Sequence, residues 1–168
     1  AIEHRRAKQR CAVEIHRQSI MRGDKTVGFT AGNFDLLHPG YIYTFEEAKR
    51  HCDVFLVFLQ RDPSATRNTK YKPVIPLYER YKTLMSIKYI DEVYMYQTEE
   101  ELYELIKHFK PDIRILGEDY IGKGFTGDDL PPHVIYTTRS HDWSTHQAQR
   151  LDNTTNSEAK PRCYEQET

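Results

Sequence analysis

The sequence predicts an α/β fold, as a single doubly wound, Rossmann-like domain with a mainly parallel five-stranded sheet. Short apolar segments alternate with helical patterns along the chain, which is the order that parallel strands and their crossover helices require. The apolar segments are nearly continuous, as in Val-Phe-Leu-Val-Phe-Leu over 54–59, which indicates strands covered on both faces. A glycine-bearing turn over 31–41 joins the first strand to the first helix, where open α/β sheets place ligands.

Five strands and four helices are expected within residues 24–151, which we predict to form the folded domain. The strands are expected at 25–31, 54–59, 92–96, 112–116 and 133–138, and the helices at 40–51, 76–89, 99–109 and 144–151. Pro76 and Ser144 are typical of helix starts, and Thr98 with Glu101 forms a capping box.

The two ends of the chain lack this alternation. Residues 1–23 are charged with a ragged helical stripe, and we interpret them as a solvated or dimer-packing helix, with a phosphate- or RNA-contacting arm as the alternative. Residues 152–168 are polar and without periodicity, so a frayed, disordered tail is expected there.

Composition narrows the class of protein. The 168 residues suffice for one domain with a core, and a net charge of −1 gives no basis for binding nucleic acid. No apolar run approaches the roughly 18 residues that a membrane helix needs, and no signal peptide begins the chain. Three scattered cysteines indicate reduced thiols rather than disulfides or a metal site. We therefore expect a cytoplasmic protein without membrane insertion.

The turn over 31–41 predicts a phosphate site. Backbone N–H groups at the start of the following helix have no partner within that helix and favour anions. His38 adds a donor or a cation near the helix start, and Asp35 adds a carboxylate.

This turn also carries a resemblance to a known family. Gly-Asn-Phe-Asp-Leu-Leu-His-Pro-Gly-Tyr over 32–41 resembles the Gly-Thr-Phe-Asp-x-x-His-x-Gly-His signature of cytidylyltransferase-like nucleotidyltransferases, and most of all that of glycerol-3-phosphate cytidylyltransferases. The resemblance implies that His38 donates a hydrogen bond to a triphosphate and stabilises charge as the α-phosphorus is attacked. Asp35 either holds the turn or orients the substrates. The nucleotide-binding residues implied in this turn are Ala31, Gly32, Asn33, Phe34, Asp35, His38 and Gly40.

Two residues depart from the family signature, Asn33 in place of the usual Thr and Tyr41 in place of the second His. A phenol at position 41 donates one hydrogen bond but carries no positive charge near neutral pH. Losing one transition-state donor typically costs about 2.7–4 kcal/mol, or roughly 10² to 10³ in rate. Tyr41, counted here among the catalytic residues, is therefore compatible with a slow enzyme, an enzyme with a compensating donor, or a non-catalytic nucleotide-binding protein.

The basic loop, residues 60–75, follows the second strand on the same edge of the sheet as His38. In the family this loop carries lysines that contact the phosphates and the acceptor, so Lys70 and Lys72 are catalytic candidates, with an ordinary solvated turn as the alternative. Lys-Tyr-Ile-Asp-Glu-Val over 88–93 resembles the Arg-Tyr-Val-Asp-Glu-Val motif that is typical of cytidylyltransferases. The resemblance implies that Lys88 binds nucleotide, whereas we interpret Asp91 and Glu92 as a surface turn without chemistry.

Two later segments complete the implied site. Gly-Glu-Asp-Tyr over 117–120 resembles a family Gly-Asp-Asp-Trp segment, which makes Gly117 and Asp119 nucleotide-binding candidates. The following Gly-x-Gly-x-x-Gly over 122–127 is interpreted as a flexible flap, because no helix pattern follows it.

Arg-Ser-His-Asp-Trp-Ser-Thr over 139–145 resembles the family's Arg-Thr-Glu-Gly-Ile-Ser-Thr motif. Arg139 is thereby implied as a catalytic, phosphate-binding fork, with Ser144 and Thr145 capping the last helix while holding the β- and γ-phosphates.

The resemblance implies transfer of CMP from CTP to a phosphorylated small alcohol or sugar, glycerol 3-phosphate above all, with release of pyrophosphate. Mg²⁺ is expected on the triphosphate, with few or no protein ligands, and a homodimer is expected from the family. Adenylyl transfer to a sugar phosphate is the alternative, since Lys-Pro-Val-Ile-Pro-Leu-Tyr-Glu-Arg over 72–80 resembles a motif of heptose-phosphate adenylyltransferases. Nucleotide binding without catalysis is the second alternative, because of Tyr41.

Overall fold

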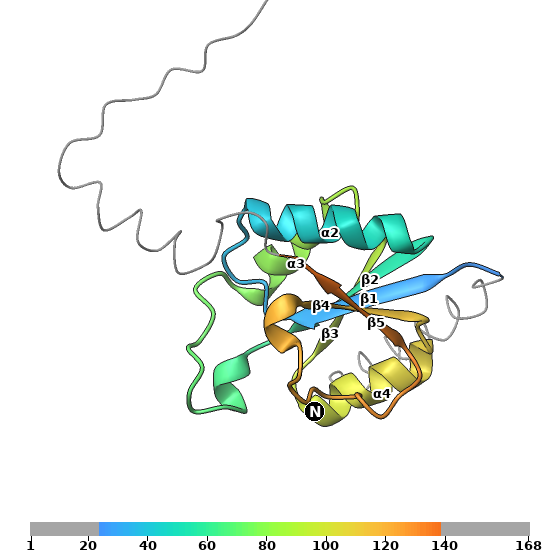
Figure 1. The fold of residues 1–168 in the computed structure, drawn as a ribbon. Helices are drawn as coiled ribbons and strands as arrows, with labels where there is room; N and C mark the ends of the chain where they lie inside the picture. The colour runs from blue at the N-terminus through green and yellow to red at the C-terminus, as the bar shows by residue number, and fades with distance from the viewer. Residues whose placement is uncertain (1–23, 139–168) are drawn as a thin grey trace, which may run out of the picture.

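The computed structural model describes residues 24–138, and an all-parallel, five-stranded sheet forms its centre (Figure 1). The strands are β1 (Val27–Gly32), β2 (Val54–Gln60), β3 (Glu92–Tyr96), β4 (Ile113–Gly117) and β5 (His133–Thr137). The helices are α2 (Pro39–His51), α3 (Leu77–Met85) and α4 (Glu99–Phe109), with short 3₁₀ helices at Pro63–Ala65 and Glu118–Tyr120. The α/β class predicted from the sequence is confirmed. The helices predicted over 1–23 and 144–151 and the predicted tail lie outside the described residues.

The strand order β3-β2-β1-β4-β5 makes β1 the central strand. The chain winds outward from β1 to β3 and then returns to build β4 and β5 on the other side, so the topological switch point lies between β1 and β4. Six residue pairs join β1 to β2, whereas only Gly28↔Ile113 and Phe29↔Arg114 join β1 to β4. The two strands therefore part toward their carboxyl ends, which opens the crevice where ligands bind in such sheets.

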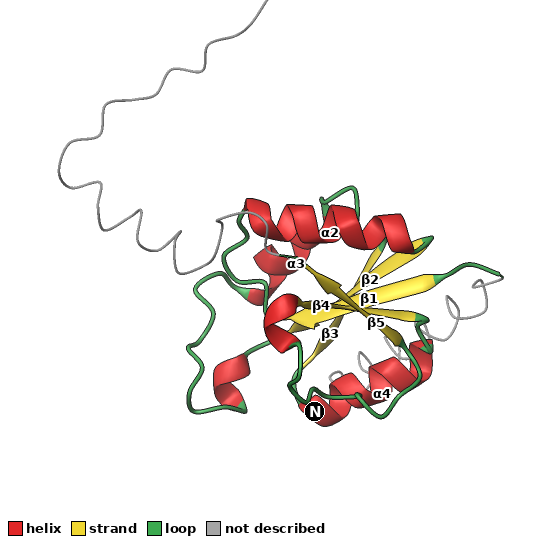
Figure 2. Ribbon diagram, in the orientation of Figure 1, coloured by secondary structure: helices red, strands yellow, loops and turns green. Residues whose placement is uncertain are grey.

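Two apolar layers cover the sheet, one on each face. The position of β2 between them explains its continuously apolar sequence. Phe55, Val57 and Leu59 pack under α2 and α3, while Leu56 and Phe58 face α4 on the opposite side. Figure 2 shows these helices above and below the sheet. Side chains alternate between the faces of a strand, so a strand covered on both faces needs apolar residues at every position.

Helix α3 is shorter than the sequence predicts. The pattern predicted a helix over 76–89, but the helix ends at Met85 and Ser86 caps it. The Ser86 hydroxyl donates to the carbonyl oxygen of Thr83 at 2.7 Å, and its N–H bonds the carbonyls of Lys82 and Thr83. Serine competes for backbone groups in this way and favours helix ends. Lys88 consequently lies beyond the helix, in the turn that leads to β3.

Helix α4 begins with the predicted Thr98 cap, but Glu101 bonds the residue before the cap instead of Thr98 itself. The Thr98 hydroxyl accepts the N–H of Glu101 at 3.2 Å, and the Glu101 carboxylate accepts the N–H of Gln97 at 2.7 Å. The helix ends at Phe109, and the C-cap residue Lys110 adopts a left-handed conformation with φ 45°. No helix within residues 24–138 is long and apolar enough to span a membrane.

Aspartates secure the amino edge of the sheet, where the parallel strands begin. Asp53 and Asp112 precede β2 and β4 and accept the N–H groups of Thr26 and Val27, each at 2.8 Å. Asp91 precedes β3 and accepts the N–H of Phe55 at 2.6 Å. Each carboxylate thus gives a hydrogen-bond partner to a backbone N–H at the start of a neighbouring strand. The interpretation of residue 91 as part of a turn without chemistry agrees with this structural role.

Candidate functional site

The signature turn, residues 33–38, leaves the carboxyl end of β1 and enters α2. Phe34 is held at φ 44°, and its buried ring lies 5.6 Å from the ring of Tyr41 and 5.7 Å from that of Phe45. A Cβ atom on Gly32 would lie 3.3 Å from the Phe34 ring, a tighter contact than is usual, so the ring packs closely over this glycine. The apolar anchor fixes the path of the backbone from the sheet to the helix.

His38 is the N-cap residue of α2, and Pro39 occupies the first helical position. The imidazole makes no capping hydrogen bond, and the first turn of α2 contains no acidic side chain. The Tyr41 ring lies 4.6 Å from the imidazole, packed against the aromatic cluster of Phe34 and Phe45. An imidazole and a phenol therefore lie side by side at a helix N-terminus, where the backbone favours an anion.

Asp35 holds the signature turn against the basic loop. Its two carboxylate oxygens accept the N–H groups of Val74 and Ile75 at 2.9 and 2.8 Å. Of the two roles left open by the sequence, the structure displays the holding role. The basic loop is thereby fixed beside the signature turn, which brings Lys70 and Lys72 to the carboxyl edge of the sheet.

Arg80 ends the motif over 72–80 but was not among the candidate site residues predicted from the sequence. It is 2 % exposed, and its guanidinium donates to the carbonyl oxygens of Ile75, Asn33 and Gln60 at 2.9, 2.6 and 2.9 Å and to that of Arg61 at 2.5 Å. Burial lowers the pKa of this guanidinium, while Asp35 and Asp62 oppose the shift. The available signal was an arginine in the first turn of the helix that follows the basic loop.

A cavity of about 280 Å³ opens at the switch point between β1 and β4, on the face of the sheet that α4 covers. Ala31, Gly32 and Asn33 line one side of it, at the start of the signature turn. Tyr96 and Arg114 also line it, and both side chains are buried. Burial raises the pKa of the Tyr96 hydroxyl and lowers the pKa of the Arg114 guanidinium.

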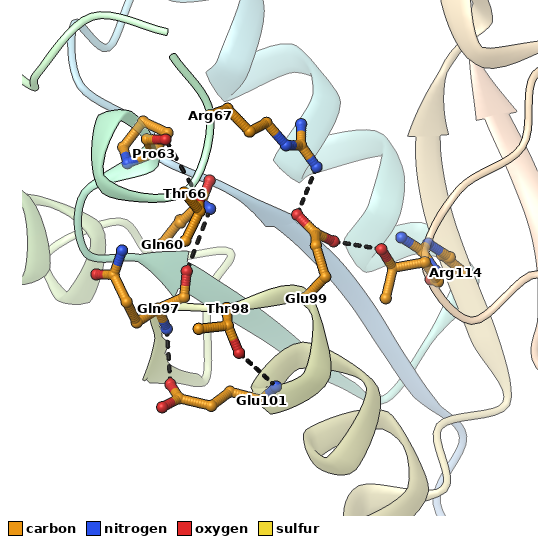
Figure 3. Close-up of polar contacts among 10 residues, drawn as sticks. Gln60, Pro63, Thr66, Arg67, Gln97, Thr98, Glu99, Glu101 and Arg114 are labelled. Carbon is orange, nitrogen blue, oxygen red and sulfur yellow. Dashed lines mark hydrogen bonds and ion pairs between the residues drawn. The ribbon is translucent and has the colours of Figure 1, made fainter. Parts of the chain in front are cut away.

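A polar network lies along the cavity wall (Figure 3). Arg67 of the basic loop forms an ion pair with Glu99 at 2.5 Å between Nη2 and Oε1. The hydroxyl of Thr126 donates to the other Glu99 oxygen, and Arg114 Nη1 donates to the Thr126 carbonyl oxygen. The flap predicted over 122–127 is therefore bonded to α4 and β4 through Thr126.

The predicted site residues outside the signature turn fall into three groups: those at the carboxyl edge of the sheet, one at the amino edge, and those outside the described residues. At the carboxyl edge, Lys70 lines the cavity, and Lys72 is exposed in the same loop. Gly117 ends β4 and Asp119 lies in the following 3₁₀ helix, both at the carboxyl edge. Lys88 lies at the opposite, amino edge, where its Nζ stands 4.9 Å from the centre of the Tyr89 ring, so the structure does not bring it to the site. The third group, Arg139, Ser144 and Thr145, lies outside the described residues.

Metal ligands are not clustered in this part of the chain. Within residues 24–138, no group of three or more histidine, cysteine or acidic side chains converges to hold a metal ion.

Comparison with known proteins places the chain among nucleotide-transferring folds. A family model described as cytidylyltransferase-like matches residues 29–141. The bifunctional protein HldE of Nitratiruptor sp. is 35% identical over 123 residues, which are 73% of this chain and 26% of that protein. HldE of Caulobacter vibrioides is 38% identical over 105 residues, 62% of this chain and 22% of that protein. The alignments thus span about a quarter of the length of these curated relatives.

Solved structures share the fold at lower identity. A lipopolysaccharide core biosynthesis protein from Thermoplasma volcanium superposes with a TM-score of 0.50 at 22% identity, covering 79% of this chain and 89% of that one. Pantothenate synthetase from Thermus thermophilus superposes with a TM-score of 0.54 at 15% identity, covering 81% and 68%.

Proposed function

This chain belongs to the cytidylyltransferase-like family, and from that premise we propose that it transfers a nucleotidyl group from a nucleoside triphosphate to a phosphorylated acceptor. The observation that supports the proposal most is the signature turn. It presents His38 at the N-terminus of α2 on one side and lines the cavity with Asn33 on the other. The nucleotide would bind across the helix N-terminus, and the acceptor would approach from the cavity.

The reaction needs few groups from the protein. An oxygen of the acceptor phosphate attacks the α-phosphorus and forms a new P–O bond, while the bond to the β-phosphate breaks and pyrophosphate leaves. A phosphate monoester is already largely ionised near neutral pH, so no strong base is required. Positioning and charge stabilisation carry the catalysis. His38 donates to the transferring phosphate, while Lys70 and Lys72 hold the acceptor and the departing charge.

CTP is the first donor to test, and a phosphorylated small alcohol or sugar such as glycerol 3-phosphate the first acceptor. The family supports this choice. The Lys-Tyr-Ile-Asp-Glu-Val run gives it less support than the sequence implied, because that run lies at the amino edge. Adenylyl transfer to a sugar phosphate is the second candidate, and the HldE relatives favour it.

Mg²⁺ is proposed to arrive bound to the triphosphate. Phosphate oxygens and water would supply most of its coordination, as is usual for Mg²⁺ with nucleotide substrates.

The test is pyrophosphate release from CTP or ATP with Mg²⁺ and a panel of phosphorylated alcohols and sugars. Wild type is compared with Tyr41→His, which restores the usual second histidine. Turnover by wild type would support the proposal and identify the donor and acceptor. Turnover only in Tyr41→His would show an intact site that has lost fast chemistry. Binding of nucleotide with no release by either protein would favour the non-catalytic alternative.

Three further expectations stay predictions. Sedimentation equilibrium would test the homodimer, cell fractionation would test the cytoplasmic location, and limited proteolysis would test whether 24–151 forms the stable domain.

A further inference from the structure

Among the described residues that line the cavity, cationic side chains outnumber carboxylates. Arg67, Lys70 and Arg114 line it, Glu99 is the one carboxylate among these described lining residues, and the charge of Asp128 acts on Arg114 from nearby. Glu99 is engaged by Arg67 and by the Thr126 hydroxyl. Among residues 24–138, neither Lys70 nor Arg114 forms an ion pair with a carboxylate. A cavity with this balance favours an anionic occupant.

Arg114 is the unusual member of this set, because it lies within a strand that is otherwise apolar. It is 5 % exposed, and its guanidinium carbon lies 5.2 Å from the centre of the Phe29 ring and 4.5 Å from that of Phe125. One nitrogen, Nη1, donates to the Thr126 carbonyl. Its Nε is buried without a hydrogen-bond partner. A buried guanidinium with an unused donor is costly, and such a group calls for a reason.

The cavity's position and size restrict what an occupant can be. Lys70 of the basic loop and Arg114 of β4 both line the cavity, and Lys70 is exposed whereas Arg114 is buried. A volume of about 280 Å³ lies below the range typical of sites for drug-sized ligands, roughly 300–1,000 Å³, which suits a compact molecule. A small acceptor with its phosphate beside Lys70 would therefore direct its other end at Arg114.

We propose that this cavity binds the end of the acceptor remote from the attacking phosphate, and that this end carries a second anionic group, a carboxylate or a second phosphate, held by Arg114. The proposal rests on the proposed function, because it assigns the substrate class of the same site. The two rings beside the guanidinium exclude water, and charge-assisted hydrogen bonds are stronger in such surroundings. An acceptor of the phosphoglycerate type meets these requirements, whereas glycerol 3-phosphate lacks the second charge.

The test is calorimetric titration of the full chain with three probes: glycerol 3-phosphate, 3-phosphoglycerate and glycerol 1,3-bisphosphate. Titrations with CTP or ATP present are run in a metal chelator, so that no transfer takes place. Wild type is expected to bind at least one of the last two probes roughly 10- to 100-fold more tightly than glycerol 3-phosphate, as one charge-assisted hydrogen bond implies. The carboxylate and the phosphate probe distinguish the two kinds of anion.

Arg114→Met removes the charge but retains an apolar side chain of similar length. It is expected to lose the preference and to keep the affinity for glycerol 3-phosphate and for nucleotide. Lys123→Met is the matched control, because Lys123 is an exposed cation of the flap that does not line the cavity. It should retain the full preference. If Arg114→Met does not fold, the comparison of the three probes in wild type decides alone.

Equal binding of the three probes by wild type, binding of none of them, or a preference that survives in Arg114→Met would each overturn the proposal. Pyrophosphate release is measured in parallel. Turnover with glycerol 3-phosphate and no preference would leave the proposed function standing without this inference. A preference that depends on Arg114, with no turnover for any acceptor, would leave the anion site standing without the function.

Discussion

The two edges of the sheet use their charged residues differently. At the amino edge, Asp53, Asp91 and Asp112 each accept a backbone N–H from the start of a neighbouring strand. At the carboxyl edge, Asp35 and Arg80 bond backbone groups in a similar way and hold the loops together.

At the carboxyl edge, charged side chains also line a cavity. Lys70 and Arg114 line that cavity and form no ion pair with a carboxylate in residues 24–138. This difference shows that membership of a family motif does not by itself tell whether a residue stabilises the fold or lines the site. The motif that contains Lys88 and Asp91 secures the amino edge, whereas the motif that contains His38 shapes the site. Removing charges from each edge should therefore have separable effects on activity and stability.

The largest effect is expected from His38→Ala at the carboxyl edge. Loss of one donor to the transferring phosphate should lower kcat by roughly 10² to 10³, with the melting temperature nearly unchanged. The measurement is steady-state pyrophosphate release with the acceptor that wild type uses. His108→Ala, on the exposed side of α4, is the control and should retain full activity. Full activity in His38→Ala would remove the catalytic role of this edge.

Arg80→Met should have the largest effect on stability. The change leaves four carbonyl oxygens without their guanidinium donor, and we expect the free energy of unfolding to fall by about 3 kcal/mol or more. Urea denaturation measures it. Arg50→Met is the control, since its side chain is 70% exposed near the end of α2. An unchanged urea midpoint for Arg80→Met would contradict the role of Arg80 in joining the loops.

A smaller loss of stability is expected at the amino edge. Asp91→Ala removes the acceptor for Phe55 N–H and the partner of Lys49 at 2.5 Å, and it should cost about 1–2 kcal/mol. kcat/KM per folded molecule should not change. Asp91→Asn keeps an acceptor oxygen and should recover part of the loss. A fall in kcat/KM of the folded fraction would show that the two edges are not independent.

The smallest effect is expected from Lys88→Ala. Since Lys88 lies at the amino edge beside Tyr89, its loss should leave nucleotide affinity within roughly twofold of wild type by titration calorimetry. Lys70→Ala is the informative partner, because it removes a cation that lines the cavity and should raise the KM for the acceptor. Weaker nucleotide binding by Lys88→Ala would reinstate the role that the family motif implied.

The fold was predictable because its signals are local. Continuous apolar runs identified the five strands to within about two residues at each end, and the capping pattern identified the start of α4. The end of α3 was not predictable from apolar spacing, because Ser86 ends the helix through hydrogen bonds to nearby carbonyls.

The site was predictable only in part, for a related reason. The signature turn is one contiguous segment, so its residues could be read together. The cavity instead depends on β1 lying beside β4 in the sheet, although β2 and β3 come between them in the sequence. Arg114 therefore reads in sequence as a polar residue within an apolar strand, and its relation to Thr126 and Phe125 appears only when the flap is placed.

The narrow pairing of β1 with β4 has a consequence for the folding reaction. β1, β2 and β3 with their helices form a sequence-local unit, whereas the contact of Val27 with Asp112 closes a loop of 85 residues. Closing long loops is slow, so the half that contains β4 and β5 should join last. The cavity lies across the contact between β1 and β4, so it does not exist before the two strands pair. A molecule that binds there would stabilise only the fully assembled chain and slow its unfolding.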